Sequence, residues 1–173
     1  MFFCDNIPNN PDWRNNSIAF VTGEQPGKLV MKAVFNKSRS EQFMAWQFYF
    51  GDKIAGRKSE LTAFNSVVVR ARSDKKTKIS IGLVMKDGKL FSAEFPVDTE
   101  FSDIRIPLNQ FRSDSLLLLP RPYPGFQPLW FLSDSKKKFD MLNAEKLIIS
   151  LGKELSVNDK YTIEVASVLV TKK

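Results

Sequence analysis

Hydrophobic and polar residues alternate one by one through the middle of the chain. Between positions 67 and 72 the odd positions are apolar, whereas Arg70 and Arg72 occupy even positions. A period of two is the spacing at which the side chains of a β-strand point to opposite faces of a sheet. The same alternation recurs three more times, so we expect an antiparallel meander of four strands at 67–72, 78–86, 91–97 and 104–106.

Turn residues separate these segments. The stretch Asp74–Lys76 is short enough for a tight connection, and Pro107 closes the fourth segment. The dipeptide Asp87-Gly88 indicates a hairpin with a type I′ turn, because glycine adopts a positive φ without steric cost and aspartate often tolerates one.

The flanking sequence continues the β pattern. Segment 43–50 is apolar on both faces, as in a central strand, and we expect Trp46, Phe48 and Phe50 in the core. Further strands are expected at 28–35, 146–151 and 161–170, and single helical turns within 108–117 and 140–145. The pattern predicts an all-β, antiparallel β-sandwich of roughly eight to ten strands, forming one domain over residues 1–173.

A proline-rich segment interrupts the alternation. Four prolines fall between positions 120 and 128, and proline lacks the N–H that a ladder strand needs. We expect an extended, stiff loop there. Its aromatic residues Tyr123, Phe126 and Trp130 could serve as platforms for a ligand or could close the end of the sandwich.

Composition narrows the class of partner. The chain has 26 Lys and Arg against 19 Asp and Glu, a net charge of +7, which favours a polyanionic partner. The basic residues are dispersed and do not alternate with aromatic ones, so nucleic-acid binding is not expected. No apolar run is long enough to require a membrane. The single cysteine, Cys4, excludes an internal disulfide.

The absence of certain residues and motifs argues against catalysis. The chain has no histidine, which removes Ser-His and Cys-His pairs and the usual neutral-pH general base. It has no glycine-rich phosphate-binding loop. Two carboxylates could still hydrolyse a glycosidic bond, but the acidic residues lie mostly in turns. Glu94 and Glu164 are the exceptions, inside predicted strands.

Polar side chains should gather on the face of the sheet opposite the core. If Val67, Val69 and Ala71 point inward, Arg70 and Arg72 point outward, and we expect Ser80, Ser92 and Glu94 to join them with Gln47 and Tyr49. Guanidinium, amide and carboxylate groups pair with sugar hydroxyls, and aromatic rings stack on pyranose faces. The alternative is a solvated surface that binds nothing.

The order of these segments resembles a known family of modules. The chain is similar to a jelly-roll, galactose-binding-like carbohydrate-binding module. The similarity lies in the segments Trp46 to Phe50, Ser66 to Ser73, Lys78 to Gly88, Ile104 to Leu108 and Tyr161 to Val165. The stretch 118–126 further resembles accessory domains of bacterial polysaccharide-degrading enzymes.

The resemblance implies a non-catalytic, monomeric module in a larger secreted or periplasmic protein. Its partners would be a polysaccharide or oligosaccharide and the catalytic glycoside hydrolase or lyase domain of the same chain. The net charge of +7 would favour an acidic glycan. It implies no cofactor beyond a structural calcium, whose first-strand and last-strand ligands would be Asp5 and Glu164.

Two other functions stay open. The chain could be a structural sandwich that packs on a catalytic domain without binding sugar. It could also be a jelly-roll lyase, for which Arg70 or Arg72 would have to lie beside a tyrosine in a deep cleft.

Overall fold

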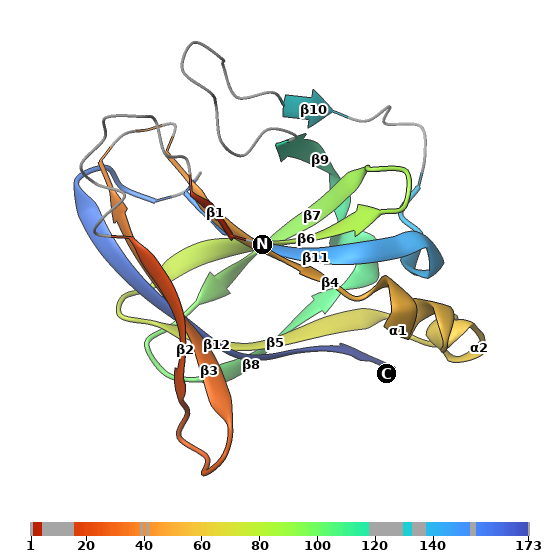
Figure 1. Cartoon of the computed structure of the whole chain (residues 1–173), viewed down its shortest axis with the longest axis horizontal. Helices are drawn as coiled ribbons and strands as arrows, with labels where there is room; N and C mark the ends of the chain where they lie inside the picture. Colours follow the sequence, from red (N-terminus) through yellow and green to blue (C-terminus); the bar gives the residue numbers. More distant parts are fainter. Residues whose placement is uncertain are drawn as a thin grey trace.

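A computed structural model describes residues 2–4, 16–38, 40, 42–117, 130–132, 138–152 and 155–172. Over these residues the strands form two antiparallel sheets that face each other as a β-sandwich (Figure 1). The all-β sandwich predicted from the alternation is confirmed.

The larger sheet has seven strands in the order β1-β4-β11-β6-β7-β9-β10. Their bounds are Phe2–Cys4, Met44–Tyr49, Ala144–Leu151, Thr77–Met85, Leu90–Val97, Arg112–Leu117 and Trp130–Leu132. The smaller sheet has five strands in the order β2-β3-β12-β5-β8. Their bounds are Ser17–Thr22, Leu29–Lys37, Asp159–Thr171, Ser66–Ser73 and Ser102–Pro107.

Short helical pieces fill the connections. Helices α1 (Gly51–Ala55) and α2 (Lys58–Leu61) link β4 to β5 and bury Ile54 and Leu61. The helical turns expected within 108–117 and 140–145 are the 3-10 helices η2 (Leu108–Gln110) and η3 (Met141–Asn143).

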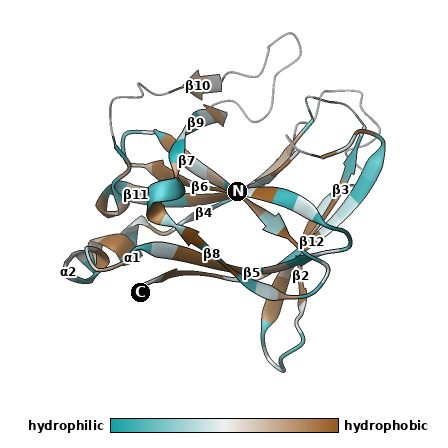
Figure 2. Cartoon of the chain, turned by 180° about the vertical axis from the view of Figure 1, so that it is seen from behind, coloured by the Kyte–Doolittle hydropathy of each residue, from teal (hydrophilic) through white to brown (hydrophobic). Residues whose placement is uncertain are grey.

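The core lies between the sheets and comes from the inward positions of both. Hydrophobic residues recur along strands of each sheet in Figure 2. Val67, Val69 and Ala71 of β5 are fully buried, as the alternation predicted, and Ile81 and Ile149 meet them from the larger sheet. Each fully buried aliphatic side chain stabilises the fold by about 1.5–3 kcal/mol.

The expected four-strand meander is wrong. Strand β5 belongs to the smaller sheet, β6 and β7 form a hairpin in the larger one, and β8 returns to pair with β5. Between β5 and β8 the chain therefore crosses between the sheets twice. Alternation reveals which side of a strand is buried but not which sheet the strand joins, since both sheets bury the same core.

The hairpin between β6 and β7 is confirmed, with a different turn. Gly88 has φ +82°, but Asp87 is not among the described residues with positive φ, as a type I′ turn would require. The Gly88 amide donates to the Met85 carbonyl at 2.9 Å, and the Met85 amide donates to the Lys89 carbonyl at 2.7 Å. This is the three-residue loop with glycine in the left-handed position.

The β2–β3 hairpin projects beyond the rest of the sandwich (Figure 1). Its inward-facing residues near the tip therefore lack an opposing sheet, and Phe20 and Leu29 are each 63% exposed. The aromatic strand β4 is also less buried than expected: Trp46 is buried and Phe50 half-buried, but Phe48 is 38% exposed.

Candidate functional site

The outer face of the larger sheet brings polar side chains from neighbouring strands into register. Ser80 of β6 lies opposite Ser150 of β11 on one side and opposite Glu94 of β7 on the other. We call Ser150, Ser80 and Glu94 the polar row. With neighbouring strands about 4.8 Å apart, the row spans about 10 Å.

The polar row has unused hydrogen-bonding capacity. Within the part of the chain that the structure describes, the side chains of Ser80, Ser150 and Glu94 take part in no hydrogen bond or ion pair. Glu94 is exposed and both serines are half-buried. Two hydroxyls and a carboxylate thus lie side by side, available to a ligand with several hydroxyl groups.

A second polar group lies next to the row. The Ser92 hydroxyl donates to Asp114 of β9 at 2.6 Å, and Arg112 of β9 is paired in register with Ser92. Arg112 donates to the carbonyl of Asn109 and, at 3.2 Å, to that of Phe111. These side chains are already held in place, so they offer fixed oxygens and N–H groups beside the row.

The centre of this face is apolar. Ala45, Val84, Leu90 and Ile148 are buried there, with Phe43 and Leu116 packed against them. A Cβ at Gly82 would come within 2.6 Å of a Leu90 methyl, so the Leu90 side chain lies over that glycine. The outer face is therefore a hydrophobic centre flanked by polar side chains, rather than the uniformly polar surface that the alternation suggested.

Gln47 and Tyr49 of β4 lie on this same outer face. Gln47 is paired with Ile148, and Tyr49 with Lys146. Tyr49 is 58% exposed, and its hydroxyl donates to Asp52 at 3.3 Å. The negative charge of Asp52 raises the pKa of Tyr49 above its ordinary value, so the phenol keeps its proton and remains a donor. Both residues, with Glu94, remain predicted ligand contacts.

Arg70 and Arg72 do not join them. Both lie on the outer face of the smaller sheet, because β5 is hydrogen-bonded to β12 and β8. The two faces are on opposite sides of the sandwich, so the expectation of a single polar face was wrong. The error follows from assigning β5 to the same sheet as β6 and β7.

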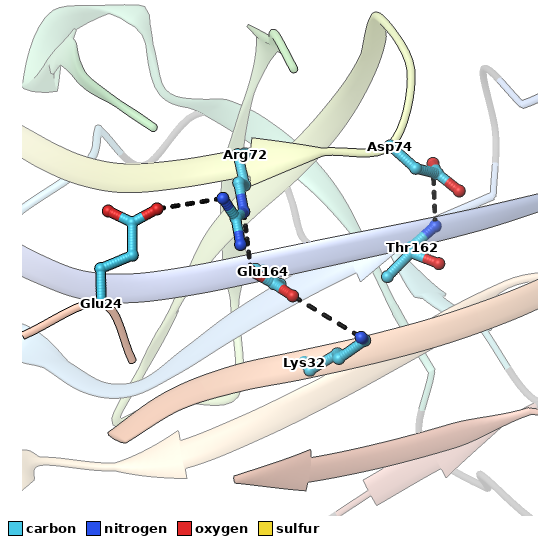
Figure 3. A network of polar contacts seen from close by, with 6 residues as sticks. All are labelled: Glu24, Lys32, Arg72, Asp74, Thr162 and Glu164. Carbon is cyan, nitrogen blue, oxygen red and sulfur yellow. Dashed lines mark hydrogen bonds and ion pairs between the residues drawn. The ribbon is translucent and has the colours of Figure 1, made fainter. Parts of the chain in front are cut away.

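Both arginines contact neighbouring side chains, and Figure 3 shows those of Arg72. Arg72 donates to Glu164 at 2.8 Å and to Glu24 at 3.0 Å, and lies 4.4 Å from the centre of the Phe101 ring. Arg70 pairs with Asp103 at 3.2 Å. The ring that they contact is a phenylalanine, not the tyrosine that a lyase site would need.

The calcium site expected from Asp5 and Glu164 stays a prediction, and the structure shows the surroundings of Glu164 alone. Glu164 accepts from Arg72 and lies 3.7 Å from the Lys32 ammonium, so two cations already surround its carboxylate (Figure 3). Asp5 lies outside the described residues. The strand before it, β1, pairs with β4 and so belongs to the other sheet from β12. Within the described ranges, no group of three or more Cys, Asp or Glu side chains could hold a metal ion.

The predicted loop aromatics fall largely outside the described residues, Tyr123 among them. The backbone of Trp130 begins strand β10, paired with Leu117 of β9. A short strand that the sequence did not predict therefore begins at Trp130, two residues after the last proline. Tyr123 and Trp130 remain predicted ligand contacts.

Sequence reasoning missed several residues of the outer face. Ser150 sits in a strand read only as apolar, and Asp114 and Arg112 lie in a stretch read as a helical turn. Alternation along β11, where Ser150 follows Ile148 at a spacing of two, was the signal that could have found Ser150.

No known family model matches the sequence, and no curated protein matches it. In the described part of the chain, no helix is both long and apolar enough to cross a membrane. Comparisons with solved structures, in contrast, give consistent matches to one fold.

The family 11 carbohydrate-binding module from Clostridium thermocellum in complex with a β-1,3-1,4-mixed-linked tetrasaccharide matches with a TM-score of 0.62. The identity is 13%, over 91% of this chain and 82% of that one. The same module of a cellulosomal cellulase matches with a TM-score of 0.60 and the same identity and coverage. An exo-β-agarase matches with a TM-score of 0.55 and 16% identity, over all of this chain and 25% of the agarase. The jelly-roll fold of carbohydrate-binding modules, expected from the sequence, is confirmed.

Proposed function

We propose that this chain is a non-catalytic carbohydrate-binding module that binds a polysaccharide or oligosaccharide on the outer face of its larger sheet. The observation that carries the proposal is the polar row, where Ser150, Ser80 and Glu94 lie in register with no partner among the described residues. The fold shared with carbohydrate-binding modules supports it.

The chemistry of the face suits a sugar chain. Hydroxyls and a carboxylate can both pair with sugar hydroxyls, each neutral hydrogen bond contributing about 0.5–1.5 kcal/mol and a charged one about 1.5–3 kcal/mol. The adjoining apolar centre offers surface to the C–H faces of the rings. Several weak contacts along about 10 Å would then add up to a usable affinity.

The row favours an uncharged glycan. Its one charge is the negative Glu94, which would repel an acidic polymer at close range. Cations on the same face, such as Arg112 and Lys146, lie outside the row, and others are held in ion pairs such as those of Arg72 and Lys75. We therefore propose a neutral ligand in place of the acidic one that net charge alone suggests.

We place the module within a larger extracellular or periplasmic protein, beside a catalytic domain. The agarase of which this chain spans 25% supports that setting, since a domain of the same fold there forms part of a larger chain.

A second candidate is a structural sandwich that packs on its neighbouring domain. Edge strand β10 favours it, because Phe131 and Leu132 are 38% and 67% exposed there. This candidate predicts no heat of binding with any glycan.

Calorimetric titration of the full chain separates the two. The ligands are neutral mixed-linkage β-glucan oligosaccharides, agaro-oligosaccharides and xylo-oligosaccharides, with polygalacturonate as an acidic comparison. We expect binding to at least one neutral glycan. Ser80→Ala and Ser150→Ala should each weaken it about threefold to tenfold, and Glu94→Gln about tenfold or more.

Matched controls come from outside the face. Ser167, half-buried on the outer face of the smaller sheet, and exposed Glu100 give the variants Ser167→Ala and Glu100→Ala, which should bind as the wild type does. Equal losses in these controls, or no binding to any glycan, would refute the proposal.

A further inference from the structure

A groove opens between the two sheets where β2 and β4 come together. Its volume is about 370 Å³, and its lining includes Ser17, Phe20, Met31, Trp46, Gln47 and Phe48. Phe20 and Phe48 are 63% and 38% exposed, so two aromatic rings are available at its walls.

The strand topology leaves these rings uncovered. Strand β1 pairs only with Met44 to Trp46, so β4 beyond Trp46 has no described neighbour on that side. Strand β2 is the edge of the smaller sheet, in the hairpin that projects past the sandwich (Figure 1). The sheets thus separate at this edge, and inward-facing side chains border open space.

A polar group is buried in the groove wall without a partner. Trp46 is 3% exposed, and its indole Nε1 has no hydrogen-bond partner among the residues that the structure describes. A buried donor without an acceptor destabilises the fold, because the N–H group loses its hydrogen bond to water and gains none in return. An acceptor brought in by a ligand, after a small movement of the rings, would remove that cost.

The lining also defines the class of ligand. Among the described residues that line the groove none is charged, although the chain carries a net +7. The lining combines aromatic rings with the polar residues Asn16, Ser17 and Gln47, and so matches an uncharged ring that has C–H faces and hydroxyls at its rim. A sugar ring has that chemistry.

Gln47 connects the groove to the proposed glycan site. It lines the groove and also lies on the outer face of the larger sheet, in register with Ile148. A sugar chain lying on the outer face could therefore continue around β4.

We propose that this groove is a subsite for one neutral sugar ring, held between Phe20 and Phe48. The inference rests on the proposed carbohydrate binding and adds a second contact region at the edge of the sandwich. It assigns to β2, and to the exposed side of β4, a role in the recognition of the ligand.

The test is calorimetric titration of the full chain with whichever neutral oligosaccharide binds in the panel above. Phe20→Ala and Phe48→Ala should each weaken binding about threefold to tenfold, the loss of one stacking ring. Leu169→Ala is the control, because Leu169 is 56% exposed on the outer face of the smaller sheet and should have no effect.

The outcomes separate this inference from the proposed function. If Ser80→Ala weakens binding but both phenylalanine variants bind like the wild type, the groove is not a subsite, and the outer face stands alone. If no glycan binds to the wild type, the proposed function fails and the groove inference fails with it.

Nuclear magnetic resonance gives a second readout that does not depend on variants in the groove. The indole N–H signal of Trp46, assigned with Trp46→Phe, should shift during titration with the same oligosaccharide. A Trp46 signal that stays fixed while signals of the polar row move would overturn the inference.

Discussion

Single residues are constrained most tightly where backbone segments meet. Gly152 has φ +141°, and a Cβ there would lie 2.7 Å from the Gln42 carbonyl oxygen and from the Cα of Phe43. Its own carbonyl accepts from the buried Lys37 ammonium. The close approach of backbone to backbone leaves no room for a side chain.

Gly152→Ala should therefore destabilise the fold by about 3 kcal/mol, because it combines a strained φ with a backbone collision. Urea denaturation monitored by circular dichroism measures the loss. Gly56→Ala is the control: Gly56 has φ −74° and its nearest contact is at 3.6 Å, so alanine should change stability by less than about 1 kcal/mol. Equal effects of the two substitutions would contradict this account.

At the scale of elements, one carboxylate ties three strands of the smaller sheet together. Glu164 of β12 contacts Lys32 of β3 and Arg72 of β5, and its side chain is only 14% exposed (Figure 3). The three residues lie in register across the strands.

Glu164→Ala should lower the free energy of unfolding by about 2 kcal/mol, since it leaves two cations facing each other without their shared acceptor. Asp103→Ala removes an ion pair with Arg70 whose carboxylate is 63% exposed, and should cost less than about 1 kcal/mol. Urea denaturation of both variants tests the ranking. A larger loss in Asp103→Ala would show that the three-strand contact is not what stabilises this face.

The turn after β5 is joined to the start of β12 by an ion pair that depends on pH. The hydrogen bond with Asp159 raises the pKa of Lys75, and the hydrogen bond with Lys75 lowers the pKa of Asp159. A carboxylate with a lowered pKa stabilises the fold above its ordinary value, near pH 4, and loses this effect as the pH falls through its folded pKa. The lysine with a raised pKa stabilises below about pH 10.4 and loses this effect as the pH rises further.

Asp159→Asn should therefore flatten the decline of stability between about pH 4 and pH 2, as measured by urea midpoints across that range. A residual decline is expected from Asp98, whose pKa is lowered by a hydrogen bond from the Thr99 amide and by Lys76. Lys75→Met should reduce the alkaline decline in the same way. An unchanged acid profile in Asp159→Asn would rule out the pair as its source.

The sequence predicted the strands better than it predicted which strands pair with each other. Strands β5 to β8 follow from alternation, because each has one face in the core. Strands β3, β4, β11 and β12 follow from hydrophobic segments bounded by turn residues. Strand β2 shows no such pattern, since it projects beyond the opposing sheet and its residues are exposed or half-buried on both sides. Strand β9 is too polar at Ser113, Asp114 and Ser115 to stand out from a turn.

The candidate site was only partly predictable for the same reason. Glu94, Gln47 and Tyr49 were placed on an outward face from alternation alone, and they do share one face. Arg70 and Arg72 were placed there too, because nothing in a period of two tells which sheet a strand enters. That choice depends on long-range contacts in the core, which a single sequence does not specify.

At the scale of the whole molecule, the net charge favours an acidic ligand, whereas the charge of the polar row favours a neutral one. The chain carries +7, yet the polar row contains one carboxylate and no cation. Binding of a neutral glycan should therefore change less than about twofold between 0.05 and 0.5 M NaCl, roughly the range over which exposed charge interactions are screened. Titration at both salt concentrations measures it. A fall of tenfold or more would indicate an acidic ligand held by basic residues instead.

The central claim is that sugars are recognised on the outer face of the larger sheet. The most direct measurement is a map of backbone amide shifts in isotope-labelled protein during titration with a neutral oligosaccharide that binds. The account predicts that the largest shifts fall on β6, β7 and β11, around Ser80, Glu94 and Ser150, while the amides of Arg70 and Arg72 stay unchanged. Shifts centred on the amides of Arg70 and Arg72, with unchanged amide signals in the polar row, would contradict it.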